Sequence, residues 1–149
     1  MEKICLNTIK DTSWIMTEKI DIFDLIQISL DDKKNRLARV VVKVNDPESP
    51  IYIESTKILK QHLQGVFDTA VLQGCNTLLI TYEETDSSVT IIIEDDGLYS
   101  DNRRKKYTQL IKDTVKGLGI NIKIQRSRIG GCRISLTLKK WRGTLPMWY

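Results

Sequence analysis

The feature that most limits how this chain can fold is a regular apolar stripe in its middle. Apolar residues recur at intervals of three and four between residues 58 and 71, which is the spacing of one face of an α-helix. Ser55 or Thr56 supplies the N-cap, and Gly74 stands where such a helix ends. The stripe therefore predicts one long amphipathic helix, the longest in the chain.

Shorter apolar runs on both sides of this helix predict strands and further helices. Hairpins with helices between them favour an α/β (α+β) two-layer sandwich. We expect a mixed, mostly antiparallel sheet of about five strands, with three helices on one face. The predicted strands are 39–44, 77–82, 89–93, 120–124 and 133–138, with a short extended piece at 51–53, and the other predicted helices are 4–16, 20–30 and 107–115.

Composition indicates a single globular domain. The 149 residues are 41% hydrophobic and 28% charged, and no apolar run approaches the ~20 residues of a membrane-spanning helix. Three widely scattered cysteines and the absence of a secretion signal favour a cytoplasmic location. We expect a domain at 19–140, a helical lead-in at 1–18 and an aromatic tail at 141–149.

Charge is unevenly distributed along the chain. There are 18 acidic and 10 basic residues up to Asp101, but one acidic and 13 basic residues from Asn102 onward. Such a split favours an electrostatic docking surface, unless both halves share one sheet and their charges mix on its surface. Aromatic residues are not interleaved with the basic ones on a strand pair, so nucleic-acid binding is disfavoured.

Common catalytic and metal motifs are absent from the sequence. It contains no P-loop, no GxGxxG, no HExxH, no CxxC and no GxSxG. The single histidine, His62, cannot form a zinc site and lies at the edge of the apolar stripe. We interpret it as a packing residue, with a phosphoryl-accepting histidine as the alternative.

Three segments in a fixed order carry a resemblance to a known family. They are LKQHLQGVFDTAVLQG, TLLITYEETDSSVTIIIEDDG and YTQLIKDTVKGLGINIKIQRSRIGGCRISLTL, preceded by IDIFDLIQISLDD. Together, over about residues 18–139, they resemble the catalytic and ATP-binding domain of sensor histidine kinases, in the GHKL ATPase family. The resemblance implies the sandwich fold and a bacterial two-component signalling context.

The resemblance assigns a nucleotide-reading role to the EDDG motif. Asp95 and Gly97 match the aspartate that accepts a hydrogen bond from the adenine amino group and the glycine two places later. A DDG sequence also forms a turn after a strand. Both interpretations stay open at this point.

The magnesium position of the family departs from its usual pattern here. Matching Ala70 to the family's alanine places Thr69 at the metal-binding position and Gly65 at its partner position one turn earlier. Glycine has no side chain, and a neutral hydroxyl is a poor ligand for Mg²⁺. Asp68 is either a substitute ligand or a solvated acid.

The expected lid over the phosphates lacks glycine between Gly97 and Gly117. Glycine normally permits backbone amides to approach phosphates closely. Its basic run either attracts an anion or forms a solvated loop before the next helix. That run consists of Arg103, Arg104, Lys105 and Lys106.

The C-terminal tail carries side chains typical of protein interfaces. They either contact a partner or fold back over a sheet edge. These residues are Trp141, Met147, Trp148 and Tyr149.

Taken together, these departures predict a degenerate histidine-kinase ATPase-like domain that works through contact with a signalling protein, either a kinase or a response regulator. We expect weak or no ATP binding, no cofactor and no catalytic residue. The alternative is a working domain that binds ATP and Mg²⁺ and phosphorylates a histidine on a separate segment, so enzymatic activity stays open. A homodimer is compatible with either function.

Overall fold

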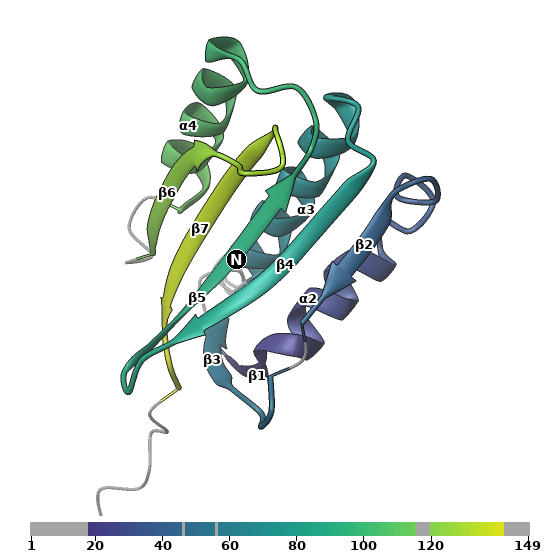
Figure 1. Ribbon diagram of the computed structural model, residues 1–149. Coiled ribbons are helices and arrows are strands. Elements are labelled where there is room, and N and C mark those ends of the chain that lie inside the picture. The colour runs from purple at the N-terminus through teal and green to yellow at the C-terminus, as the bar shows by residue number, and fades with distance from the viewer. Residues whose placement is uncertain (1–17, 46, 56, 116–119, 142–149) are drawn as a thin grey trace, which may run out of the picture.

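The computed structural model describes residues 18–45, 47–55, 57–115 and 120–141. Five strands form the main sheet in the order β2-β4-β5-β7-β6, in which β2 is parallel to β4 and the other neighbours are antiparallel (Figure 1). The described elements are β1 (Glu18–Asp21), α2 (Ile22–Asp31), β2 (Val41–Val44), β3 (Tyr52–Ser55), α3 (Lys57–Leu72), β4 (Thr77–Glu84), β5 (Ser88–Asp95), α4 (Asp101–Val115), β6 (Asn121–Arg126) and β7 (Cys132–Lys139).

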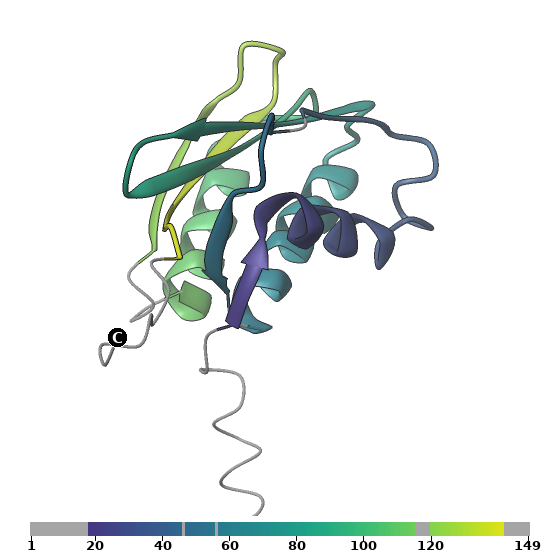
Figure 2. The same ribbon diagram turned by 90° about the horizontal axis from the view of Figure 1, so that it is seen from below.

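The three helices within these ranges cover one face of the sheet, and the opposite face is open (Figure 2). The predicted two-layer sandwich is therefore confirmed. Over the same ranges, no helix is both long enough and apolar enough to cross a membrane. The predicted helix 4–16 lies outside the described residues, and the domain boundaries at 1–18 and 141–149 stay predictions.

The core lies between the sheet and the helices. Along β7, buried and half-buried residues alternate, so one face of the strand meets the helices. The apolar stripe of α3 packs against that face, as its spacing predicts. Gly74 has a φ of +76°, which suits the turn after α3 and explains why the helix ends there.

A short strand at 18–21 was not predicted. It precedes α2 and pairs with β3 in a separate two-stranded sheet, so the predicted helix 20–30 begins at Ile22 instead. Asp21 ends the strand and caps the helix, since its carboxylate accepts a hydrogen bond from the Phe23 N–H at 3.3 Å. Only four residues long, β1 is too short for its alternation to stand out from the helical pattern that follows.

Helix α4 begins six residues earlier than predicted, at Asp101 instead of Tyr107. Ser100 caps it, because its hydroxyl accepts a hydrogen bond from the Arg103 N–H at 3.2 Å. In the first turn the inward position belongs to Arg103, which is 0% exposed, so no apolar residue marks that turn in the sequence. Residues 101–106 are therefore helical, and the predicted solvated loop is wrong.

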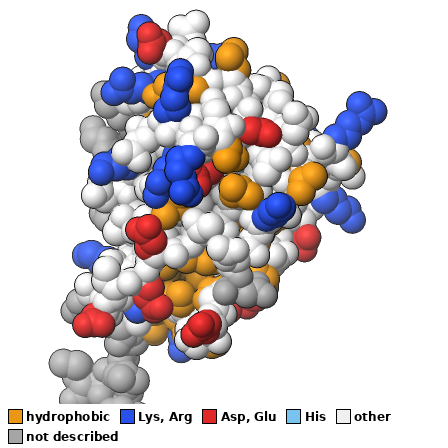
Figure 3. Space-filling model, in the orientation of Figure 1, with side chains coloured by type: hydrophobic (Ala, Val, Ile, Leu, Met, Phe, Trp, Pro, Cys, Tyr) orange, Lys and Arg blue, Asp and Glu red, His pale blue; other side chains and the backbone are white. Residues whose placement is uncertain are grey.

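Acidic and basic side chains mix on the folded surface. The strand β5 from the acidic half pairs with β7 from the basic half, and ion pairs join the halves at Asp95–Arg103, Glu84–Lys140 and Glu94–Arg128. On the open face of the sheet, Lys and Arg side chains are interspersed with Asp and Glu (Figure 3). The split along the sequence therefore does not become a split on this face.

His62 is the source of a pH-dependent stability. It is 1% exposed, and neither ring nitrogen has a hydrogen-bond partner among the described residues, so its predicted packing role is confirmed. Desolvation lowers the pKa of His62 from 6.5 to about 4. The unfolded chain therefore binds a proton at higher pH than the folded domain does.

We predict that the contribution of His62 to the free energy of unfolding is greatest above about pH 6.5 and falls as the pH drops toward 4. The expected loss between pH 7.5 and pH 5 is about 2 kcal/mol. Urea unfolding at both pH values measures the difference. The variant His62→Leu removes this contribution, so its stability should change less with pH over this interval. An unchanged pH dependence in that variant would contradict the assignment.

Candidate functional site

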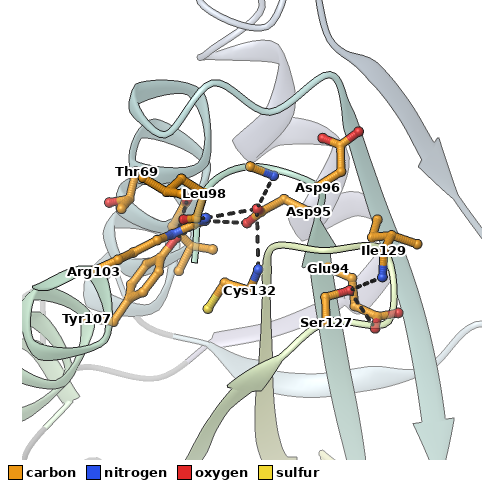
Figure 4. A network of polar contacts seen from close by, with 12 residues as sticks. Thr69, Glu94, Asp95, Asp96, Leu98, Arg103, Tyr107, Ser127, Ile129 and Cys132 are labelled. Atoms are coloured by element: carbon orange, nitrogen blue, oxygen red, sulfur yellow. Dashed lines mark hydrogen bonds and ion pairs between the residues drawn. The ribbon is translucent and has the colours of Figure 1, made fainter. Parts of the chain in front are cut away.

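The candidate site is built around Asp95, at the end of β5. Its side chain points to the opposite side of the strand from that of Glu94, as Figure 4 shows, and the residue is 2% exposed. Four N–H groups reach its carboxylate. Two come from Arg103, one of them at 3.0 Å, and the others are the backbone N–H groups of Gly97 at 2.9 Å and Cys132 at 3.4 Å (Figure 4).

Arg103 reaches Asp95 from the first turn of α4. Its guanidinium also donates to the Leu98 carbonyl at 2.8 Å and contacts the Tyr107 hydroxyl at 3.1 Å. Burial alone would lower the pKa of Arg103, but its hydrogen bond to Asp95 and its contact with Tyr107 raise that pKa above the ordinary value. The result is a charged guanidinium enclosed in the protein.

Tyr107 connects this ion pair to the long helix. It follows Arg103 by four residues, so both side chains lie on one face of α4. Its hydroxyl donates to the Val66 carbonyl of α3 at 3.4 Å, and burial raises the pKa of Tyr107 above the ordinary value. This tyrosine was not predicted as a site residue, although its spacing from Arg103 is visible in the sequence.

Gly97 and Gly131 lie so close to the Asp95 carboxylate that a side chain at either position would crowd it. A Cβ on Gly131 would lie 2.3 Å from both Oδ1 and the backbone oxygen of Asp95. A Cβ on Gly97 would lie 3.2 Å from the same Oδ1 and 3.3 Å from Arg103 Nη1. The ion pair is therefore tightly packed on these sides. Gly131 was not predicted as a site residue.

The second aspartate of EDDG has a structural role. Asp96 accepts backbone hydrogen bonds from Asn76 at 2.7 Å and Thr77 at 3.0 Å, at the start of β4. Desolvation raises the pKa of Asp96, but the hydrogen bonds from Thr77 and Asn76 outweigh it, so that pKa lies below the ordinary value. The motif thus forms a turn after a strand, in addition to presenting Asp95.

The two candidate residues on α3 are both engaged within the protein. The Asp68 carboxylate binds Lys33 at 2.9 Å and Arg36 at 3.7 Å, both in the segment between α2 and β2. Thr69 donates its hydroxyl to the Gly65 carbonyl at 2.9 Å, within its own helix. Asp68 therefore belongs to a different cluster from Asp95, whereas Thr69 lies near the Asp95 site in Figure 4.

The predicted basic run is divided by the helix that contains it. Arg103 faces inward, whereas the side chains of Arg104, Lys105 and Lys106 are exposed. The expectation that all four lie together in a solvated loop is therefore corrected.

Only the first residue of the aromatic tail lies within the described part of the chain. Trp141 is half-buried, and its backbone N–H donates to the backbone carbonyl of Tyr52 in β3 at 2.8 Å. The other predicted partner-binding residues, Met147, Trp148 and Tyr149, lie outside the described residues.

Solved structures similar to this chain include domains of histidine kinases. The chain aligns with the ATP-binding domain of PrrB from Mycobacterium tuberculosis at 19% identity and a TM-score of 0.71, covering 84% of this chain and 98% of that one. The catalytic domain of the histidine kinase ThkA gives 13% identity and a TM-score of 0.71, covering 83% and 97%.

A structure of ThkA in complex with the response regulator TrrA aligns at 15% identity and a TM-score of 0.68, covering 84% of this chain and 42% of that one. No family model and no curated protein sequence matches the chain. The solved structures show that the chain has the fold of histidine-kinase ATP-binding and catalytic domains, as the sequence predicts.

Removing one partner of the buried ion pair should destabilise the domain strongly. We predict that Arg103→Met costs about 3–5 kcal/mol, because it leaves the Asp95 carboxylate buried without its counter-charge. The double variant Asp95→Asn/Arg103→Met should cost less than the two single variants added together. Urea unfolding of all three variants measures this coupling.

A matched control lies next to Arg103 in the same helix. Arg104 is exposed, so Arg104→Met should change stability by no more than about 0.5 kcal/mol. Equal effects of the two substitutions, or additive effects in the double variant, would contradict a coupled ion pair.

Proposed function

We propose that this chain is a histidine-kinase ATPase-like domain that acts by protein–protein contact in two-component signalling, with weak or no ATP binding. One observation carries the proposal. The carboxylate that the resemblance assigns to adenine is already paired with Arg103, an arginine of the same chain.

The cost of displacing Arg103 supports weak binding. Arg103 is 0% exposed, and the Asp95 carboxylate accepts hydrogen bonds from N–H groups of Arg103, Gly97 and Cys132. A nucleotide that used this carboxylate would have to separate a buried ion pair, at a cost of about 3–5 kcal/mol. Such a cost lowers affinity by roughly two to four orders of magnitude.

The residues at the expected magnesium and phosphate positions also support the proposal. The Thr69 hydroxyl is directed to a carbonyl of its own helix, and Lys33 and Arg36 neutralise Asp68. Residues 96–100 are all that connects β5 to α4, and Gly97 is their single glycine. We infer that these residues suit a magnesium nucleotide poorly, because the Asp68 carboxylate is ion-paired with two basic side chains and a single glycine gives backbone amides little access to phosphates.

The proposed partner is a signalling protein. The structure of ThkA in complex with a response regulator is a precedent for such an assembly on this fold. We infer that a kinase or a response regulator binds this chain, and that the domain contributes a surface to the complex.

We predict that MgATP at millimolar concentration does not raise the melting temperature of the domain. A ligand present at one hundred times its dissociation constant would stabilise the folded state by about 2.7 kcal/mol, which a thermal shift measurement detects easily. Isothermal titration calorimetry over the same range should show no magnesium-dependent heat.

Two controls separate specific from loose binding. A stabilisation by MgATP that disappears in Asp95→Asn/Arg103→Met would contradict the proposal. A small effect that salt removes, and that the variant Arg104→Ala/Lys105→Ala/Lys106→Ala abolishes, would instead report attraction of phosphates to exposed basic residues.

A further inference from the structure

The strand β6 ends the main sheet, and its outer edge pairs with no other strand of the described residues. Figure 1 shows β6 at one border of the sheet. It is six residues long, whereas β2, at the opposite border, has four. An unpaired strand edge presents a row of backbone N–H and C=O groups to which another strand can bind. We call this surface the β6 edge.

The turn that follows β6 shows which of its backbone groups face outward. The Ser127 N–H donates to the Gly131 carbonyl at 2.8 Å, so these two residues form a hydrogen-bonded pair that continues the β6–β7 ladder. Hydrogen-bonded pairs alternate along an antiparallel ladder, so the odd-numbered residues of β6 bond to β7. The even-numbered residues direct their N–H and C=O groups away from β7, where these groups have no hydrogen-bond partner among the described residues. They are Ile122, Ile124 and Arg126.

The side chains of β6 form two different faces. Ile122 and Ile124 are half-buried and pack against the core on the helix side of the sheet. Lys123 is exposed and lies on the open face of the sheet, between the uncharged Asn121 and Gln125. A strand added to the β6 edge would therefore meet apolar side chains on one face and a basic side chain on the other.

The charge of Lys123 is not offset by a neighbouring acidic residue. Across the sheet, its neighbours on the open face are Ser135 of β7 and Ile92 of β5. Neither β6 nor β7 contains an acidic residue. On β5, Glu94 is only 4% exposed, and its carboxylate accepts a hydrogen bond from Ser127 at 3.1 Å. The open face of the β6 edge therefore favours a partner with acidic side chains.

We propose that the β6 edge binds an extended segment of a partner protein, which adds to the sheet as a further strand. The backbone of this segment pairs with the outward N–H and C=O groups of β6. Its acidic side chains lie beside Lys123 on the open face, and its apolar side chains cover Ile122 and Ile124 on the other. The assignment rests on the proposed function, because it names the chemistry of the partner that a domain acting by contact would bind.

A second copy of this chain is a poorer occupant of the β6 edge. The strand β6 contains no acidic residue, so a second β6 would bring another Lys123 to a surface that is already basic. Like charges on neighbouring strands are destabilising. The charge of the edge therefore selects a different, acidic strand.

The probe is a synthetic peptide in which glutamate and valine alternate, labelled for fluorescence anisotropy. In an extended conformation its glutamates share one face and its valines the other. The wild-type domain should bind it, and added salt should weaken the complex. A peptide of the same composition, with glutamates and valines in two separate blocks, should bind at least about tenfold more weakly. A peptide with lysine in place of glutamate should do the same.

Two charge reversals test the location of the site. Lys123→Glu should weaken binding of the glutamate peptide at least about tenfold and should permit binding of the lysine peptide. Lys43 is the matched control, because it is exposed on β2, at the opposite border of the sheet. Lys43→Glu should leave the binding of both peptides unchanged.

A second pair of variants tests backbone pairing. Ile124→Pro removes an outward N–H group without removing a β6–β7 hydrogen bond, whereas Ile124→Ala loses the apolar side chain but keeps the N–H group. The proline variant should bind the glutamate peptide about fivefold more weakly than the alanine variant. Thermal unfolding confirms that each variant is folded, and the charge reversals at Lys123 and Lys43 decide the question if the proline variant is not.

The proposal is overturned if the wild-type domain does not bind the alternating peptide, or binds the blocked peptide equally well. It is also overturned if Lys123→Glu and Lys43→Glu have the same effect, if folded Ile124→Pro binds like Ile124→Ala, or if light scattering shows a dimer that Lys123→Glu dissociates.

The MgATP titration is independent of the peptide measurements. Stabilisation by MgATP together with binding of the alternating peptide would remove the proposed function and leave the β6 edge as a binding site. Absence of both effects would remove only the β6 edge.

Discussion

The ion pair between Asp95 and Arg103 is the interaction on which the arrangement of the C-terminal half depends. It joins the end of β5 to the first turn of α4, and Tyr107 extends it to the Val66 carbonyl of α3. Three elements that are separate in sequence thereby share one buried polar network. Since a buried charge without its partner is very costly, α4 cannot move away from β5 without a large penalty.

Much of the fold could be predicted because periodic patterns report burial directly. The stripe of α3 and the alternation along β7 each follow from which face meets the core. These strands and helices could also be placed in one sandwich, since two hairpins and intervening helices permit few other layers. The short strand β1 escaped prediction because four residues do not establish a period.

The candidate site was predicted less completely, for a physical reason. Asp95 could be found from its motif. Its partner could not, because the residue type alone does not show whether an arginine is buried or exposed to solvent. In a run of four basic residues, only the position of the helix decides that Arg103 points inward. The roles of Gly131 and of the Cys132 N–H depend on contacts across the sheet, which local spacing does not report.

A buried ion pair is usually no better for stability than well-packed apolar side chains of similar volume, so stability alone does not account for this one. What it adds is orientation. Arg103 donates to the Leu98 carbonyl while Asp95 accepts from the Gly97 N–H, so the ion pair fixes the turn between β5 and α4 from both sides. The Leu98 N–H is bonded in turn to the end of α3. The contacts that occupy the Asp95 carboxylate therefore also hold the turn through Leu98 against the end of α3.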